Sequence, residues 1–211
     1  MTNHTNEAIV VIDVQNDFCP GGALAVDGGD EVVPVINRIL RNYPVRVFTQ
    51  DWHPAGHRSF ASAHLGKLPF ETVTMPYGPQ VLWPDHCVQG SDGAEFHEDL
   101  QTAPGHAFLR KGFNAEIDSY SAFFENDHKT PTGLDGYLRA RGVERITFAG
   151  LATDFCVAWS ALDAARLGFG VTVRLDACRA IDLDGSLARA LAEMEDAGIR
   201  LVDKATPPVP R

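Results

Sequence analysis

The sequence has 211 residues, 45% of them hydrophobic, which is enough to bury one sizeable core. With 18 Lys and Arg against 28 Asp and Glu, the formal net charge is −10. This charge disfavours binding to nucleic acid or to an anionic membrane, because basic patches supply that attraction. No apolar run approaches the roughly 20 residues of a membrane span, and residues 1–7 do not resemble a signal peptide. We therefore expect a soluble, cytoplasmic protein.

The four cysteines, Cys19, Cys87, Cys156 and Cys178, are widely spaced and form no CxxC pair. In a chain without a signal peptide, this spacing is typical of free thiols rather than of a disulfide framework. The sequence contains no internal repeat. We expect one domain over residues 1–211, with a core from about 8 to 203 and an irregular, proline-containing tail over 204–211.

Residues 8–14 form a nearly continuous β-branched run that predicts a central parallel strand, covered on both faces. Asp13 lies inside this run, where a carboxylate needs a partner because burying it alone is costly. The alternative is a strand-terminal aspartate that caps a turn. Residues 16–22 then predict a loop.

A helix is predicted next, capped by Asp30, and a second strand follows over residues 45–50. A strand, a helix and a strand within this length form a βαβ unit, whose functional loops lie beyond the carboxyl ends of the strands. The apolar positions of the helix recur at helical spacing: Val33, Ile36, Ile39 and Leu40.

Residues 51–57 (Asp-Trp-His-Pro-Ala-Gly-His) directly follow the second strand and place Asp51, His53 and His57 in one loop. Mixed nitrogen and oxygen ligands suit zinc, manganese or iron, whereas calcium prefers more oxygens. The segment therefore predicts a site for one divalent metal ion, with zinc as the first choice. A fourth ligand is available from either His86 or His64.

Residues 58–106 are long, irregular and rich in Pro, Gly and His, so we expect them to form the walls of a site. Residues 107–111 predict a further strand that ends at Lys111. A lysine at a strand end is commonly just an exposed charge. If Lys111 lies beside Asp13, it neutralises a carboxylate that is otherwise costly to bury.

The second half of the chain alternates helices and strands. Predicted strands cover residues 146–149, 171–175 and 199–202. Predicted helices separate them: one capped by Thr132 that stops at Gly142, one from about 156 to 167, and one whose inner positions are Leu187, Leu191 and Met194 and which stops at Gly198. This alternation predicts an α/β fold with a mostly parallel sheet. There is no GxGxxG after the first strand, which disfavours a dinucleotide site.

Residues 150–157 (Gly-Leu-Ala-Thr-Asp-Phe-Cys-Val) join a predicted buried strand to a helix. The first turn of a helix carries free N–H groups and the positive end of the helix dipole, so a thiol there is biased toward thiolate. Cys156 is therefore a candidate nucleophile. Taken alone, Cys156 is better interpreted as a small buried core residue, because free cysteines are among the most buried residue types.

Together, Asp13, Lys111 and Cys156 form an acid, a cation and a thiol at strand ends, and this set resembles the isochorismatase-like cysteine hydrolases. Four segments are similar to the nicotinamidase/pyrazinamidase branch of that family: residues 13–18 (Asp-Val-Gln-Asn-Asp-Phe), 50–54 (Gln-Asp-Trp-His-Pro), 83–87 (Trp-Pro-Asp-His-Cys) and 150–157. The resemblance runs from about residue 8 to about residue 203.

The resemblance implies a three-layer α/β/α domain with a six-stranded, mostly parallel sheet. It also implies hydrolysis of nicotinamide to nicotinate and ammonia in NAD salvage, with pyrazinamide as an analogue, through a thioester on a cysteine. It assigns Asp13, Lys111 and Cys156 to catalysis and the N–H groups of Ala152 and Cys156 to the oxyanion hole, beside a cis peptide before Ala152. The remaining assignments place substrate against Phe18, Trp83, Tyr120 and Phe155, and a divalent metal between Asp51, His53, His57 and His86.

Two rival functions remain at this point. One is an amidase or ureido hydrolase of the same superfamily acting on another small molecule, which the metal loop and Trp83 disfavour. The other is a non-catalytic metal-binding or interaction domain on the same fold. The joint presence of Asp13, Lys111 and Cys156 disfavours it. The sequence leaves open whether the chain is a monomer or a homo-oligomer.

Overall fold

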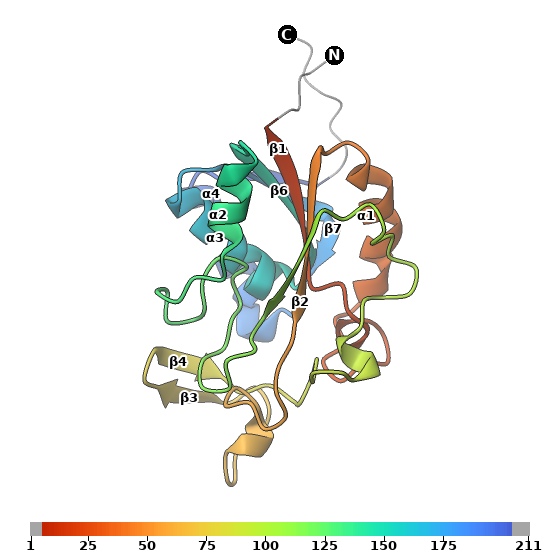
Figure 1. Cartoon of the computed structure of the whole chain (residues 1–211). Coiled ribbons are helices and arrows are strands. Elements are labelled where there is room, and N and C mark those ends of the chain that lie inside the picture. The colour runs from red at the N-terminus through yellow and green to blue at the C-terminus, as the bar shows by residue number, and fades with distance from the viewer. Residues whose placement is uncertain (1–5, 204–211) are drawn as a thin grey trace.

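A six-stranded sheet forms the centre of the computed structural model, which describes residues 6–203. The strand order is β5-β2-β1-β6-β7-β8, and every neighbouring pair is parallel. Helix α1 covers one face, and α2, α3 and α4 lie on the other (Figure 1). The strands are β1 (Glu7–Ile12), β2 (Val45–Asp51), β5 (Ala107–Lys111), β6 (Arg145–Leu151), β7 (Gly170–Arg179) and β8 (Arg200–Val202). The helices are α1 (Val32–Leu40), α2 (Leu134–Ala140), α3 (Ala158–Arg166) and α4 (Ser186–Asp196).

The six predicted strands and the α/β/α layers are confirmed, because their sequence patterns match how each element is covered. The apolar residues of β1 are fully buried, as a strand with helices on both faces requires. The four apolar positions predicted for α1 are buried too: Val33, Ile36, Ile39 and Leu40. No described helix is long and apolar enough to cross a membrane. The predicted tail over 204–211 lies outside the described residues.

The region 58–106 is more ordered than the sequence predicted. It contains an antiparallel hairpin of β3 (Thr72–Met75) and β4 (Gly78–Val81), set apart from the main sheet (Figure 1). The sequence did not predict β4 because it contains Gly78 and Pro79. Proline removes a backbone donor and glycine weakens a strand, so both residues argue against one. The predicted cap at Asp30 is also wrong. A short 3₁₀ turn over Gly29–Glu31 precedes α1, and no side chain caps the helix.

Two glycines allow close approach at the edge of the sheet that later proves functional. Gly150 has φ +123°, and a Cβ there would lie 2.0 Å from the carbonyl oxygen of Ile12 on the adjacent strand. Gly112 follows β5 with φ +68°, and a Cβ there would lie 2.5 Å from the ring of His53. Glycine is needed at both positions, because any side chain would push apart segments that must meet.

Candidate active site

The predicted catalytic side chains gather at the carboxyl edge of four adjacent strands. Asp13 directly follows β1, Lys111 ends β5, and Asp51 ends β2 between them. The parallel register of β2 and β5 pairs Asp51 with Lys111 directly. Cys156 comes from the turn that follows β6, on the other side of β1. The sheet topology therefore brings together residues that are more than 140 positions apart in the sequence.

The ammonium group of Lys111 lies at the centre of this arrangement. The side chain is only 1% exposed, although a lysine at a strand end is commonly solvated. Its Nζ lies 2.8 Å from Asp13 Oδ2, 2.6 Å from Asp51 Oδ1 and 3.4 Å from Cys156 Sγ. It also donates to the carbonyl oxygen of Ser119 at 2.8 Å. One buried cation thus contacts two buried carboxylates and the thiol.

Asp13 is held from a second side by Thr49, a fully buried residue of β2. The Thr49 hydroxyl donates to Asp13 Oδ1 at 2.5 Å and accepts the Asp13 backbone N–H at 3.2 Å. The backbone of Asp13 has φ 46°, in the left-handed region where aspartate is tolerated better than most residues. The Asp13 carboxylate therefore has one oxygen on Thr49 and the other facing Lys111.

The three charged groups differ in the direction of their pKa shifts. Burial raises the pKa of Asp13, and the Asp51 charge adds to the rise, against the lowering effects of Lys111 and Thr49. Burial also raises the pKa of Asp51, but the positive charges of Lys111 and His53 outweigh this effect. The pKa of Asp51 is therefore well below its usual value. Burial would lower the pKa of Lys111, yet Asp13 and Asp51 raise it well above its usual value. Lys111 therefore stays charged, and Asp13 takes up a proton at a higher pH than Asp51 does.

Cys156 lies in a π-helical turn, Thr153–Val157, that leads into α3. The helical segment therefore begins about three residues before the predicted start near residue 156, and its first turn is a π-helix rather than an α-helix. Single π-helical turns are frequent at functional sites. The expected bias toward thiolate is wrong for this environment. Burial raises the pKa of the Cys156 thiol well above its usual value, and Lys111 only partly offsets it against Asp13 and Asp51. The thiol therefore holds its proton until a base removes it, and an Asp13 oxygen lies within 4.8 Å of Sγ.

An aromatic pocket leads to Cys156. Its walls include all four residues predicted to contact substrate, together with Ala152, Asp51 and His86. The rings of Trp83 and Phe155 meet edge to face with centroids 4.9 Å apart, and the indole N–H of Trp83 donates to the Tyr120 hydroxyl at 3.0 Å. The implied cis peptide is present between Leu151 and Ala152. The aromatic residues of the pocket are Phe18, Trp83, Tyr120 and Phe155. The pocket thus places flat apolar walls next to the thiol and next to two predicted metal ligands.

Asp51, His53 and His86 form a set that fits a divalent metal. Asp51 Oδ2 lies 3.6 Å from His53 Nε2 and 3.7 Å from His86 Nε2. Ligand atoms about 2 Å from zinc are separated by similar distances. The other ring nitrogens, Nδ1, bond to backbone carbonyl oxygens, Gly112 for His53 and Pro84 for His86, both at 2.8 Å. If Nδ1 carries the proton, Nε2 is free to bind a metal, which is the usual arrangement of metal-binding histidines.

The structure does not bring His57 into this set in the same way. Its Nε2 bonds to the carbonyl oxygen of Asn114 at 2.8 Å, and its Nδ1 bonds to the Ser59 hydroxyl at 2.8 Å. His57 instead groups with His53 and Asp118. The other candidate, His64, bonds to the carbonyl oxygen of Arg58 at 2.7 Å and joins none of the metal-compatible groups among the described residues.

Sequence reasoning missed Asp118, a pocket residue only 2% exposed. Its Oδ1 lies 4.0 Å from His53 Nε2, and its Oδ2 accepts from Gln80 at 2.9 Å. Gln80 is also buried and donates to the Tyr120 hydroxyl at 2.8 Å, so it connects the metal-compatible side of the pocket to the aromatic side. A lone acid in a loop carries no sequence signal that could have identified it.

Comparison with known proteins agrees with this geometry. The sequence model of the isochorismatase domain matches residues 7–206. The chain therefore belongs to the isochorismatase family, a class to which its parallel sheet and its cysteine site also point. A nicotinamidase of Acinetobacter baylyi is 52% identical over 202 residues, which cover 96% of this chain and 94% of the relative.

Solved structures show the same fold. A nicotinamidase/pyrazinamidase of Acinetobacter baumannii superposes with a TM-score of 0.93 at 53% identity, covering 94% of this chain and 96% of that chain. A pyrazinamidase of Pyrococcus horikoshii in complex with zinc superposes with a TM-score of 0.73 at 35% identity, covering 94% and 99%. The zinc in that relative, together with the ligand set described above, supports a divalent metal site in this chain.

The two histidine groups predict different effects on metal content. We expect His53→Ala and His86→Ala to lower metal affinity at least about tenfold, because each removes a ring nitrogen that faces Asp51. His57→Ala should retain most of the metal, because its ring nitrogens are bonded to Asn114 and Ser59. Metal per chain, measured by elemental analysis after dialysis, tests this, with His64→Ala as the matched control. Equal losses in His57→Ala and His53→Ala would instead make His57 a full ligand.

Proposed function

We propose that this protein hydrolyses nicotinamide to nicotinate and ammonia, and pyrazinamide to pyrazinoate, in the salvage of NAD. One observation carries the proposal: Cys156, Asp13 and Lys111 meet at the inner end of an aromatic pocket that also exposes Asp51 and His86. A flat ring with a carboxamide at one edge and a nitrogen at another fits this arrangement. The carboxamide would meet Cys156, and the ring nitrogen would face the side of Asp51 and His86. The nicotinamidase relative, 52% identical over nearly the whole chain, supports the same substrate.

The first half of the reaction forms a thioester. Asp13 accepts the proton of the Cys156 thiol, and the sulfur attacks the amide carbonyl carbon. Asp13 then returns the proton to the leaving nitrogen, which departs as ammonia. Lys111 keeps a positive charge beside both groups, so the carboxylate and the developing thiolate do not repel one another unopposed.

The carbonyl oxygen becomes negatively charged during the attack. We assign the backbone N–H groups of Ala152 and Cys156 to this oxyanion, since both residues line the pocket at the nucleophile. A well-placed donor of this kind contributes about 3–4 kcal/mol to the transition state. In the second half, water adds to the thioester, with Asp13 now acting as the base that takes its proton, and the carboxylic acid leaves.

Recognition of the ring is assigned to the aromatic walls and the metal. Phe18, Trp83, Tyr120 and Phe155 would hold the flat faces and edges of the ring by apolar contact. Asp51, His53 and His86 would hold the metal, which we propose to be zinc, with manganese or iron as the alternatives. When bound, this ion supplies a Lewis acid for the ring nitrogen, which fixes the ring and withdraws electron density from the carboxamide.

Replacing the nucleophile tests the activity and the mechanism together. We expect wild-type protein to release ammonia from nicotinamide and Cys156→Ala to lose at least about 10³-fold in kcat/KM, because no other thiol lines the described pocket. Cys178→Ala, a buried cysteine on β7, is the matched control and should stay near wild type. Ammonia release is measured by a coupled assay. Substantial turnover by Cys156→Ala would contradict the thioester route, and no release by metal-loaded wild type would contradict the substrate.

The hydrogen bond from Thr49 to Asp13 predicts a pH effect. Asp13 must be ionised to accept the thiol proton, so activity is lost as the pH falls through its pKa. Thr49 lowers that pKa, and Thr49→Val removes the hydroxyl at nearly constant volume. The acid limb of the kcat/KM profile should therefore move to higher pH, and the variant should lose about 2 kcal/mol of unfolding free energy. Thr147→Val on β6 is the control, and an acid limb that stays in place or moves lower would contradict the role of Asp13.

A further inference from the structure

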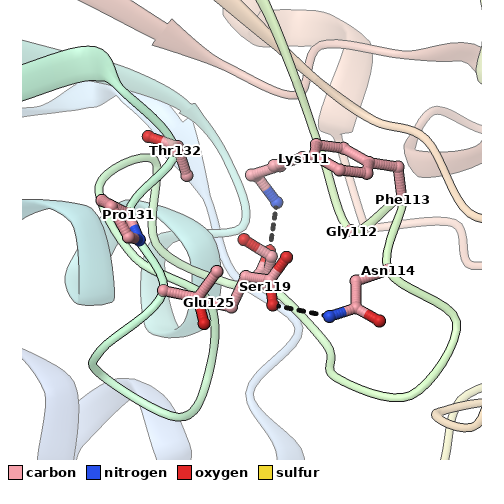
Figure 2. A pocket seen from close by; sticks show the side chains of 9 residues that line it. Lys111, Gly112, Phe113, Asn114, Ser119, Glu125, Pro131 and Thr132 are labelled. Atoms are coloured by element: carbon pink, nitrogen blue, oxygen red, sulfur yellow. Dashed lines mark hydrogen bonds between the residues drawn. The ribbon is translucent and has the colours of Figure 1, made fainter.

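A second cavity approaches the catalytic lysine from outside the aromatic pocket. It has a volume of about 330 Å³, which is within the range of small-molecule sites. We call it the Glu125 cavity. Exposed residues in its lining are Phe113, Thr130 and Pro131. Buried residues in its lining include Lys111, Ser119 and Glu125 (Figure 2). It shares no lining residue with the aromatic pocket.

Residues 118–120 form part of the wall between the two cavities. Asp118 and Tyr120 line the aromatic pocket, whereas Ser119 lines the Glu125 cavity. The carbonyl oxygen of Ser119 accepts from Lys111 Nζ, which itself lies 3.4 Å from the sulfur of Cys156. Figure 2 shows this contact at the inner end of the cavity. At this point the two cavities are therefore separated by the contacts of Lys111 with Ser119 and with Cys156.

The lining of the Glu125 cavity is mostly apolar, but it includes one buried carboxylate and two threonine hydroxyls. Glu125 is only 6% exposed, and its Oε2 accepts from the Asn114 amide at 3.0 Å (Figure 2). Among the described residues, no other side chain forms a hydrogen bond with this carboxylate. A buried carboxylate attracts ammonium, and the hydroxyls and carbonyls around it can bind water.

The aromatic pocket offers no comparable space. Its free volume is about 20 Å³, which is roughly the room for one water molecule. A ring that binds between the aromatic walls fills the pocket. In the proposed reaction the acyl group stays there, bound to Cys156, while ammonia must leave and water must arrive.

We propose that the Glu125 cavity is the path by which ammonia leaves and water reaches the thioester while the acyl group fills the aromatic pocket. This rests on the proposed amide hydrolysis. In that reaction the C–N bond breaks and the nitrogen takes the thiol proton by way of Asp13. The oxygen of water then bonds to the carbonyl carbon, the C–S bond breaks, and the sulfur regains a proton from Asp13. Both small molecules cross the wall where Lys111 meets Ser119.

Blocking the mouth of the cavity tests the path. Thr130 is exposed and lines the mouth, so Thr130→Trp narrows it without touching the catalytic groups. We expect kcat for nicotinamide to fall about fivefold or more while KM does not rise, because ring binding is unaffected. Acid-quenched samples should carry more acyl group on Cys156 than wild type, as measured by mass spectrometry.

Two controls separate blockage from damage to the loop. Lys129→Trp places the same ring on the neighbouring exposed residue, which does not line the cavity, and should match wild type. Thr130→Ala removes the hydroxyl that bonds to Asp127 but leaves the mouth open, and should also match wild type. If Thr130→Trp does not fold, Pro131→Trp fills the same mouth and takes its place.

The outcomes are distinct. Wild-type kcat and acyl level in Thr130→Trp, with an active wild type, would overturn the path and leave the proposed function standing. A fall in Thr130→Ala equal to that in Thr130→Trp would also overturn it, because the lost hydrogen bond would then be the cause. If wild-type protein itself releases no ammonia, the proposed function fails, and the path fails with it.

Discussion

The ammonium group of Lys111 is the interaction on which the site depends. Two carboxylates are buried within 2.8 Å of it, and neither would be stable as an ion in the interior without a positive partner. Because Asp51 and Lys111 end β2 and β5, and Asp13 directly follows β1, this ion cluster can form only when β5, β2 and β1 are in register. The fold and the site are therefore coupled through one charge.

The same cluster explains how a buried thiol can react. A thiol in an apolar interior keeps its proton, and burial raises the pKa of Cys156 accordingly. Activation must come from Asp13, whose own pKa is raised by burial but lowered by Lys111 and Thr49. A base and an acid with raised pKa values, side by side, can exchange one proton in both directions. The proposed mechanism needs this twice, once to form the thioester and once to hydrolyse it.

The sequence carried strong signals for elements with simple environments. Strands with helices on both faces are recognisable in the sequence as β-branched runs. Their carboxyl ends lie at one edge of the sheet, so a meeting of Asp13, Asp51 and Lys111 could be predicted. Other features depend on contacts that no local pattern encodes. The hairpin β3–β4 contains Gly78 and Pro79, which argue against a strand, and Asp118 is a single acid in a loop. The different settings of His53 and His57 depend on which ring nitrogen meets a backbone carbonyl, and only the folded chain decides this.

The most direct test of the central ion cluster is a double-mutant cycle of Lys111→Met and Asp13→Asn, with the free energy of unfolding measured by urea denaturation of metal-free protein. Lys111→Met should cost about 3–5 kcal/mol, because it leaves two buried carboxylates without their cation. Adding Asp13→Asn should recover at least about 1 kcal/mol of that loss, since one of the two unpaired charges is then gone. A cost below about 0.5 kcal/mol for Lys111→Met, or strictly additive effects, would contradict the central role of this lysine.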